Sequence, residues 1–252
     1  MNTQSLLEKA VQASEKACVE ILEVYHSGDF QAELKGDNSP LTLADKKAHD
    51  TITSTLQSFN LPILSEEGAA ISYDERKTWE YFWMIDPLDG TKEFLKRNGE
   101  FTVNIALIHK KKAVLGVVAV PVTGDIYYAS EQGAFINRKG VVKKLAYRGR
   151  INLQQPGLRV VASRSHLNTD TQQFIDSLKQ PSLVSSGSSL KFMLLAEGAA
   201  DVYPRHAPTM EWDTAAAHAI VNAVGLQVLK QGSAEELTYN KKNLLNPGFL
   251  VC

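Results

Sequence analysis

The stretch WMIDPLDGT, residues 83–91, places two aspartates between an apolar strand and the predicted start of a helix. The apolar run at residues 79–85 delivers Asp86 just past a strand end, where open α/β folds place their binding sites. A helix that begins at Gly90 and Thr91 points free backbone N–H groups at the same place, and such groups bind anions. The stretch therefore predicts a site for hard cations and a phosphate.

Other carboxylates can contribute to this site. Glu66 and Glu67 follow a short strand, while Asp45 lies near the start of a helix and Asp213 in the last clear helix. Taken singly, each has a simpler explanation. The two glutamates suit a solvated loop, Asp45 a helix cap, and Asp213 the first turn of a helix, where the dipole favours an acid. In the same way, Asp89 before Gly90 suits a turn. A turn alone does not need both aspartates of WMIDPLDGT, so we expect the carboxylates to converge around Mg²⁺.

The first part of the chain predicts two helices followed by a sheet. Apolar residues recur at three- and four-residue steps in residues 4–26 and 41–56, which is typical of amphipathic helices. Thr42 and Asp45 have the spacing of a capping box at the start of the second helix. From Phe101 the period changes to two, which indicates an antiparallel meander. Its expected strands are residues 101–109, 113–120, 125–130, 133–137 and 141–145.

The last part alternates strands and helices, as α/β architecture does. Expected strands lie at residues 158–163, 182–186 and 200–204, and expected helices at residues 168–178, 188–198 and 211–225. Gly198 and Gly225 end the last two helices. We place a soft domain boundary near residue 152, with no long linker.

Composition narrows the functional class. The chain has 252 residues, 44% of them hydrophobic, and a formal net charge of −1, which argues against a protein that mainly binds nucleic acid or an anionic membrane. The two cysteines, Cys18 and Cys252, exclude a disulfide scaffold and a cysteine metal cluster. The start of the chain has no apolar region typical of a secretory signal, and no apolar stretch is long enough for a membrane span. We expect a cytoplasmic protein, and peripheral association with the inner face of the cell membrane stays open.

Other enzyme classes find little support in the motifs. Residues 188–191 match the S-x-x-K pattern of serine acyl-enzymes, but SDN and KTG are missing, so we attribute the match to chance. The G-x-S-x-G, H-E-x-x-H, C-x-x-C and P-loop patterns are also missing. These absences exclude elbow-type serine esterases, zincins, thiol metal sites and P-loop enzymes.

Together, three motifs resemble the lithium-sensitive, Mg²⁺-dependent phosphatases of the inositol monophosphatase superfamily. They are WMIDPLDGT, the upstream SEE at residues 65–67 and the downstream WDTAAAHAI at residues 212–220. DGTKEF, NGEFTVNIAL, SRSH, GSSLKF and YPR are similar to the bacterial 3′(2′),5′-bisphosphate nucleotidases of the CysQ type. The resemblance covers nearly the whole chain. It implies a layered αβαβα sandwich of the inositol monophosphatase and fructose-1,6-bisphosphatase type, an α/β (α+β) fold.

The resemblance assigns metal ligands residue by residue. Glu66, Asp86 and the backbone carbonyl of Leu88 would hold one Mg²⁺, and Asp86, Asp89 and Asp213 would hold a second. Most of these ligands belong to an N-terminal α+β half, residues 1–152. Asp213 and the nucleotide contacts belong to a C-terminal α/β half, residues 153–252.

Catalytic and substrate-binding residues follow from the same resemblance. Glu67 would orient water, with a third, weaker ion left open, and Thr91 and Asp45 would form the pair that takes a proton from the attacking water. Residues that would contact the substrate are Gly90, Thr91, Ser163, Ser165, His166, Gly187, Ser188, Lys191 and Arg205.

The implied reaction is hydrolysis of the 3′-phosphate of adenosine 3′,5′-bisphosphate to AMP and phosphate, which serves sulfate assimilation. The sulfated nucleotide stays open as a further substrate. One alternative is a broader inositol or sugar monophosphatase, because the same metal site serves both and the pocket loops decide. A non-enzymatic alternative is an interaction protein of the same superfamily. The expected partner is a small nucleotide, with no nucleic acid or integral membrane segment, and the chain acts as a monomer or homodimer.

Overall fold

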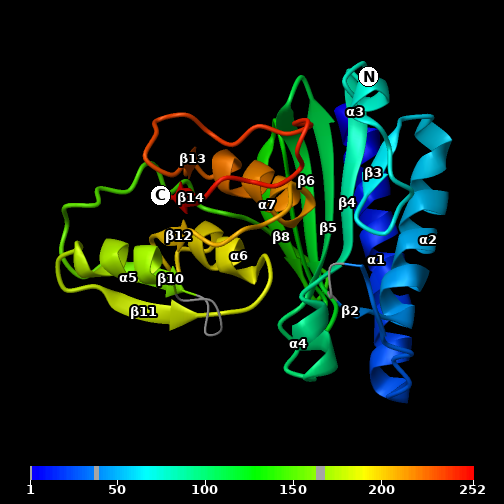
Figure 1. Ribbon diagram of the computed structural model, residues 1–252, viewed down its shortest axis with the longest axis horizontal. Helices are drawn as coiled ribbons and strands as arrows, with labels where there is room; N and C mark the ends of the chain where they lie inside the picture. Colours follow the sequence, from blue (N-terminus) through cyan, green and yellow to red (C-terminus); the bar gives the residue numbers. More distant parts are fainter. Residues whose placement is uncertain (1, 37–39, 163–167) are drawn as a thin grey trace.

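The computed structural model describes residues 2–36, 40–162 and 168–252. Its main elements stack in five layers, which Figure 1 shows from right to left: helices, a large sheet, helices, small sheets and a last helix. This arrangement is the expected αβαβα sandwich. The boundary near residue 152 stays a prediction.

The second layer is a sheet of seven strands in the order β3-β4-β5-β6-β7-β8-β9. β3 is parallel to β4, and every later neighbour is antiparallel, which confirms the predicted meander. The strands are β3 (Ile63–Ser65), β4 (Tyr81–Asp89), β5 (Thr102–His109), β6 (Lys112–Val120), β7 (Asp125–Ser130), β8 (Gly133–Arg138) and β9 (Val141–Lys144).

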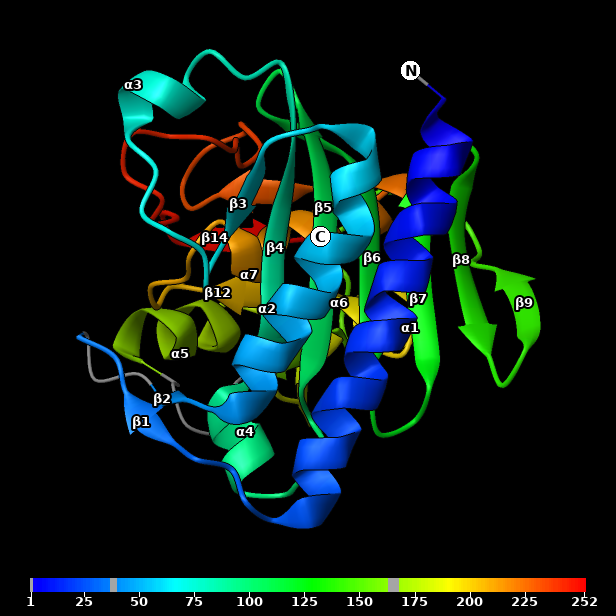
Figure 2. The ribbon, with the colours of Figure 1, turned by 90° about the vertical axis from the view of Figure 1, so that its right-hand side faces the viewer.

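Two helices, α1 (Thr3–Ser27) and α2 (Leu43–Leu56), cover one face of this sheet (Figure 2). Their apolar stripes pack on alternate residues of the strands, such as Val103, Ile105 and Leu107 of β5. This face confirms the two amphipathic helices, because their buried residues recur at the predicted three- and four-residue steps.

The opposite face carries α6 (Leu190–Ala196) and α7 (Trp212–Ala223). α7 lies very close to the sheet: a Cβ added at Gly116 of β6 would be 2.1 Å from the carbonyl oxygen of Ala216. A glycine at this point of β6 therefore permits the direct contact that brings the start of α7 to the edge of β4.

The fourth and fifth layers lie beyond α6 and α7 (Figure 1). β10 (Arg159–Ala162) pairs in parallel with β11 (Ser182–Ser185), and a bridge between Val160 and Val202 connects this pair to a three-stranded antiparallel sheet. That sheet has the order β12-β14-β13 and consists of β12 (Tyr203–Arg205), β14 (Phe249–Val251) and β13 (Val228–Lys230). The outer helix is α5 (Thr169–Asp176).

Several short elements were not predicted from the sequence. They are β1 (Glu33–Leu34), β2 (Pro40–Leu41), α3 (Tyr73–Arg76), a 3₁₀ helix (Gln57–Phe59), β13 and β14. The helix expected at Gly90 and Thr91 is α4 (Thr91–Leu95). Among the described parts of the chain, no helix is long and apolar enough to cross a membrane.

Candidate active site

β4 does not end at Asp86 but continues through an irregularity to Asp89. Asp86 pairs with Asn104 and Asp89 with Thr102, so β4 fits one extra residue between these two pairs. Such bulges bend a strand and change the direction of its side chains. The strand that was expected to end before Asp86 thus continues as a bulged strand to Asp89, and this correction explains how both aspartates face one site.

Three carboxylates meet where β4 ends. Glu66, Asp86 and Asp213 each offer an oxygen within 4.8 Å of the others. Glu66 reaches Asp86 because β3 runs parallel to β4 and the Glu66 amide donates to the Ile85 carbonyl at 3.1 Å. Asp213 comes from the first turn of α7, where its Oδ2 accepts the Met210 amide at 2.9 Å.

The close approach of these acids has an electrostatic cost. Burial raises the pKa of Asp86 well above its usual range, and the charges of Glu66 and Asp89 raise it further. Burial, followed by the charge of Asp89, likewise raises the pKa of Asp213. Buried acids that repel one another stay ionised only beside a cation, and oxygen-only ligands suit Mg²⁺. The residues present therefore fit Mg²⁺.

Lys35 is a cation of this region that the sequence did not single out. Its ammonium lies 2.8 Å from Glu66 Oε1 and also contacts Glu67. Burial acts to lower the pKa of Lys35, but the charges of both glutamates and the bonds to them outweigh this effect and raise it. In sequence, Lys35 belongs to a polar turn with no signal of its own, so only the folded chain places it beside these acids.

Thr91 and Asp45 are brought together as predicted, at the start of α4 and of α2. The Thr91 hydroxyl donates to Asp45 Oδ1 at 3.3 Å. Oδ2 accepts the amide of Thr42 at 2.7 Å and its hydroxyl at 2.5 Å, so Asp45 also forms the predicted capping box. Burial raises the pKa of Asp45 to about 6. The carboxylate thus serves as a cap on one oxygen and as an acceptor for Thr91 on the other.

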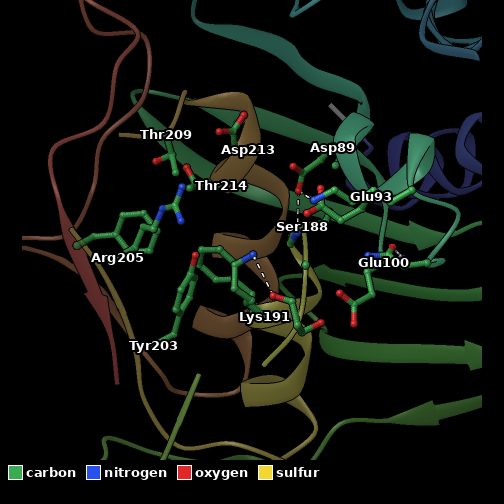
Figure 3. A pocket seen from close by; sticks show the side chains of 18 residues that line it. Asp89, Glu93, Glu100, Ser188, Lys191, Tyr203, Arg205, Thr209, Asp213 and Thr214 are labelled. Atoms are coloured by element: carbon green, nitrogen blue, oxygen red, sulfur yellow. Dashed lines mark hydrogen bonds between the residues drawn. The ribbon is translucent and has the colours of Figure 1, made fainter. Parts of the chain in front are cut away.

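Asp89 is held from the opposite side of the site. Its Oδ2 accepts the Ser188 hydroxyl at 2.5 Å and the Ser189 amide at 2.7 Å, both from the loop before α6 (Figure 3). Burial raises the pKa of Asp89, although the hydrogen bond from Ser188 opposes this shift. Asp89 therefore connects the bulge of β4 to a loop of the C-terminal part of the chain.

A cavity of about 330 Å³ opens beside Asp89 and Asp213. Lys191 of α6 and Arg205 of β12 extend into it from the side opposite the acids (Figure 3). Lys191 is only 8% exposed, and burial lowers its pKa to about 8. Its ammonium donates to the Ser186 carbonyl at 3.5 Å and lies in the wall of the cavity, where it can meet an anion.

The predicted substrate contacts divide into two groups. Ser163, Ser165 and His166 lie outside the described residues. Of the others, Gly90, Gly187, Ser188, Lys191 and Arg205 line one cavity, whereas Thr91, the next residue after Gly90, is not part of its wall.

Comparison with known proteins identifies the family. A model described as the inositol monophosphatase family matches residues 2–248. The chain belongs to this family. The 3′(2′),5′-bisphosphate nucleotidase CysQ of Salmonella typhimurium is 44% identical over 250 residues, which cover 98% of this chain and 99% of that protein. The enzyme of the same description from Escherichia coli K12 is 43% identical with the same coverage.

Solved structures agree with this assignment. The crystal structure of CysQ from Bacteroides thetaiotaomicron has a TM-score of 0.88 and 44% sequence identity, and the match covers 99% of this chain and 97% of that one. An inositol monophosphatase of Thermotoga maritima has a TM-score of 0.78 at 22% identity, covering 98% and 91%, and shows the shared fold. The predicted family and fold are therefore confirmed.

Proposed function

We propose that this protein is a Mg²⁺-dependent phosphatase that hydrolyses the 3′-phosphate of adenosine 3′,5′-bisphosphate to give AMP and phosphate. The observation that carries the proposal is the acidic cluster of Glu66, Asp86 and Asp213, because Asp213 also lines a cavity that contains Lys191 and Arg205. Full-length similarity to named 3′(2′),5′-bisphosphate nucleotidases supports the choice of substrate.

Two groups of ligands would hold the ions. One group is Glu66, Asp86 and the Leu88 carbonyl, and the other is Asp86, Asp89 and Asp213. When bound, Mg²⁺ would neutralise phosphate charge and make water more acidic. Glu67, which contacts Lys35, would orient water at the edge of this cluster. A third, weaker ion would bind at the same edge.

Thr91 and Asp45 would handle the proton. The Thr91 hydroxyl oxygen lies 3.3 Å from two acceptors, Asp45 Oδ1 and the Leu88 carbonyl. With its proton directed at Asp45, Thr91 can accept a proton from the attacking water only as its own proton moves toward that carboxylate. A carboxylate with a pKa of about 6 is ionised at neutral pH and can take that proton. No covalent intermediate with the protein is needed.

The substrate would lie with its scissile phosphate at the start of α4. Gly90 has a φ of +94°, a backbone conformation that favours glycine. The backbone amides of Gly90 and Thr91, at the start of α4, would hold that phosphate. Lys191 and Arg205 would bind the phosphate that stays on the nucleotide, because two phosphates need more positive charge than one.

The remaining predicted contacts, Ser163, Ser165, His166, Gly187 and Ser188, complete the proposed nucleotide site. A cytoplasmic location, action on the sulfated nucleotide and a monomeric or homodimeric state stay predictions.

Phosphate release from adenosine 3′,5′-bisphosphate and from inositol 1-phosphate tests the proposal. Each substrate is assayed with Mg²⁺, with Mg²⁺ plus Li⁺, and with a chelator. We expect strong Mg²⁺-dependent preference for the nucleotide and no release with chelator. Preference for the inositol ester would overturn the substrate and favour a broader monophosphatase. No release from either by well-folded protein would favour a non-enzymatic role.

A further inference from the structure

Ser188 adopts a backbone conformation that serine rarely takes. Its φ of +49° lies in the left-handed region, where a side chain is strained and glycine is not. The residue before it, Gly187, has no room for a side chain, because an added Cβ would lie 2.9 Å from the Glu100 carbonyl oxygen. The loop is therefore tightly fixed, and a serine occupies a position that glycine would fill without strain. Strain of this kind points to a function for the side chain.

That side chain makes two short hydrogen bonds. The Ser188 hydroxyl donates its single proton to Asp89 Oδ2 at 2.5 Å, so Thr102 must be the donor in the 2.6 Å bond between the Thr102 and Ser188 hydroxyls. The Asn104 amide in turn donates to the Thr102 hydroxyl at 3.2 Å. A chain of donors thus runs from Asn104, near the start of β5, to the carboxylate of Asp89.

These donors determine how Asp89 presents its two oxygens. Oδ2 is occupied by the Ser188 hydroxyl and the Ser189 amide. Among residues 2–36, 40–162 and 168–252, no hydrogen bond to Oδ1 is found. Both donors come from one rigid loop, so they restrict rotation of the carboxylate and leave one oxygen available.

We propose that Ser188 is a positioning residue that holds Asp89 in the orientation needed to bind a divalent cation. The inference rests on the proposed function, in which Asp89 is a metal ligand. Because an ordered second shell around a ligand typically changes metal affinity by about 10- to 100-fold, loss of the hydroxyl weakens the ion held by Asp89. Serine at this position is strained where glycine would not be, and that strain accompanies the gain of a hydroxyl beside Asp89.

Two substitutions separate the hydroxyl from the backbone. Ser188→Gly removes the hydroxyl and relieves the backbone strain. Ser188→Ala also removes the hydroxyl, but the backbone strain remains. Ser182→Ala is the matched control, since Ser182 is exposed at the start of β11, the strand that leads into the same loop. Mg²⁺ binding to each full-length protein is measured by calorimetry, and thermal unfolding is followed in chelator.

We expect both Ser188 variants to bind one Mg²⁺ at least about 10-fold more weakly than wild type, with the control unchanged. The KM for Mg²⁺ should rise in both Ser188 variants and stay unchanged in the Ser182→Ala control. In chelator, Ser188→Gly should unfold at a higher temperature than Ser188→Ala, because both variants lose the hydroxyl and only alanine keeps the strained φ.

Two results would overturn the inference alone. One is wild-type Mg²⁺ affinity in both variants; the other is a loss in Ser188→Ala that Ser188→Gly does not share, which would attribute the effect to the backbone. Failure of the wild-type protein to bind Mg²⁺ would instead overturn the proposed function, and this inference with it.

Discussion

The carboxylates of Asp86 in β4 and Asp213 in α7 offer oxygens within 4.8 Å of each other, although the two residues come from distant parts of the sequence. No ion pair to either is found among the described residues. Without Mg²⁺, burial and mutual repulsion therefore oppose their ionised forms, as the raised pKa of each carboxyl indicates. A carboxyl with a raised folded pKa costs stability at neutral pH and recovers it as the pH falls through that pKa.

Asp213→Asn should accordingly stabilise the metal-free protein. Removing one charge from the cluster should raise the unfolding free energy in chelator by about 1–2 kcal/mol, or Tm by about 2–8 °C. The same variant should lose most of the Mg²⁺-dependent rise in Tm that we expect for the wild type. Calorimetric melts with chelator and with Mg²⁺ measure both effects, and Asp50→Asn on the exposed side of α2 is the control. A lower Tm in chelator would show that the cluster is not under strain.

Asp86→Asn should abolish turnover and leave the fold intact. The asparagine oxygen can still accept the Leu88 amide, which donates to Asp86 Oδ1 at 3.1 Å, but the residue loses the charge that both proposed ions share. We expect a loss of more than about 100-fold in phosphate release, beyond that typical of a second-shell change. Circular dichroism and Tm check folding. An active Asp86→Asn variant would remove Asp86 from the proposed metal site.

Much of the fold could be predicted because its signals are local. Each of these elements buries one face, and the spacing of its own apolar residues shows which face that is. This holds for the apolar stripes of α1 and α2 and for the period-two pattern of β5 to β8. Short pieces such as β13 and β14 carry no comparable period, since three residues show no pattern and their pairing depends on distant chain segments.

The candidate site divides in the same way. The acidic residues themselves stand in recognisable motifs, so the cluster of Glu66, Asp86 and Asp213 was predicted from the sequence. The position of Lys35 beside Glu66 and the contact of Ser188 with Asp89 were not, because each joins chain segments that meet only after folding. The bulge in β4 was also missed, since proline and glycine after aspartate favour a turn equally well.

Thr91→Ala should lower kcat by about 100- to 10,000-fold, the usual contribution of a positioned proton acceptor. Thr91→Ser keeps the hydroxyl that donates to Asp45 and should retain most activity. Steady-state kinetics on adenosine 3′,5′-bisphosphate compare the two. Equal loss in both variants would point to packing of the threonine methyl rather than to the hydroxyl.

The wild-type pH profile gives a further test of Asp45. Its carboxyl has a folded pKa of about 6, so it is ionised and accepts the Thr91 proton above that pH. We expect kcat to fall as the pH decreases through about 6. A profile that is flat from pH 7 to 5 would exclude Asp45 from the proton transfer.

Lys191→Gln should affect the bisphosphate more than a monophosphate. A buried charged hydrogen bond contributes about 1.5–3 kcal/mol, so loss of the ammonium should raise the KM for adenosine 3′,5′-bisphosphate by about 10- to 100-fold. The KM for inositol 1-phosphate should change by less than about threefold. Lys179→Gln, an exposed lysine after α5, serves as the control. Equal changes for both substrates would place Lys191 near the scissile phosphate instead.

Asp201 provides a test of the fold that is independent of the site. It joins the start of β10 to the residues before β12: Arg159 Nη2 donates to Oδ1 at 2.6 Å, Arg159 Nε donates to Oδ2 at 2.8 Å, and Arg148 donates to Oδ1 at 3.0 Å. The hydrogen bonds from Arg159 lower the pKa of Asp201 to about 2. Since the unfolded pKa is about 3.9, these contacts stabilise the fold fully above that pH and lose their effect as the pH falls toward 2.

Asp201→Asn should therefore lower the unfolding free energy at pH 7 by about 1–2 kcal/mol, a figure reduced because the Arg159 side chain is partly solvated. At pH 2 the variant and wild type should differ much less, because Asp201 is then protonated in the unfolded protein and in about half of the folded protein. Urea unfolding at pH 7, 4 and 3 should show the difference narrowing between the last two. A difference that stays constant from pH 7 to 3 would mean that the hydrogen bonds act through geometry alone, without the charge of Asp201.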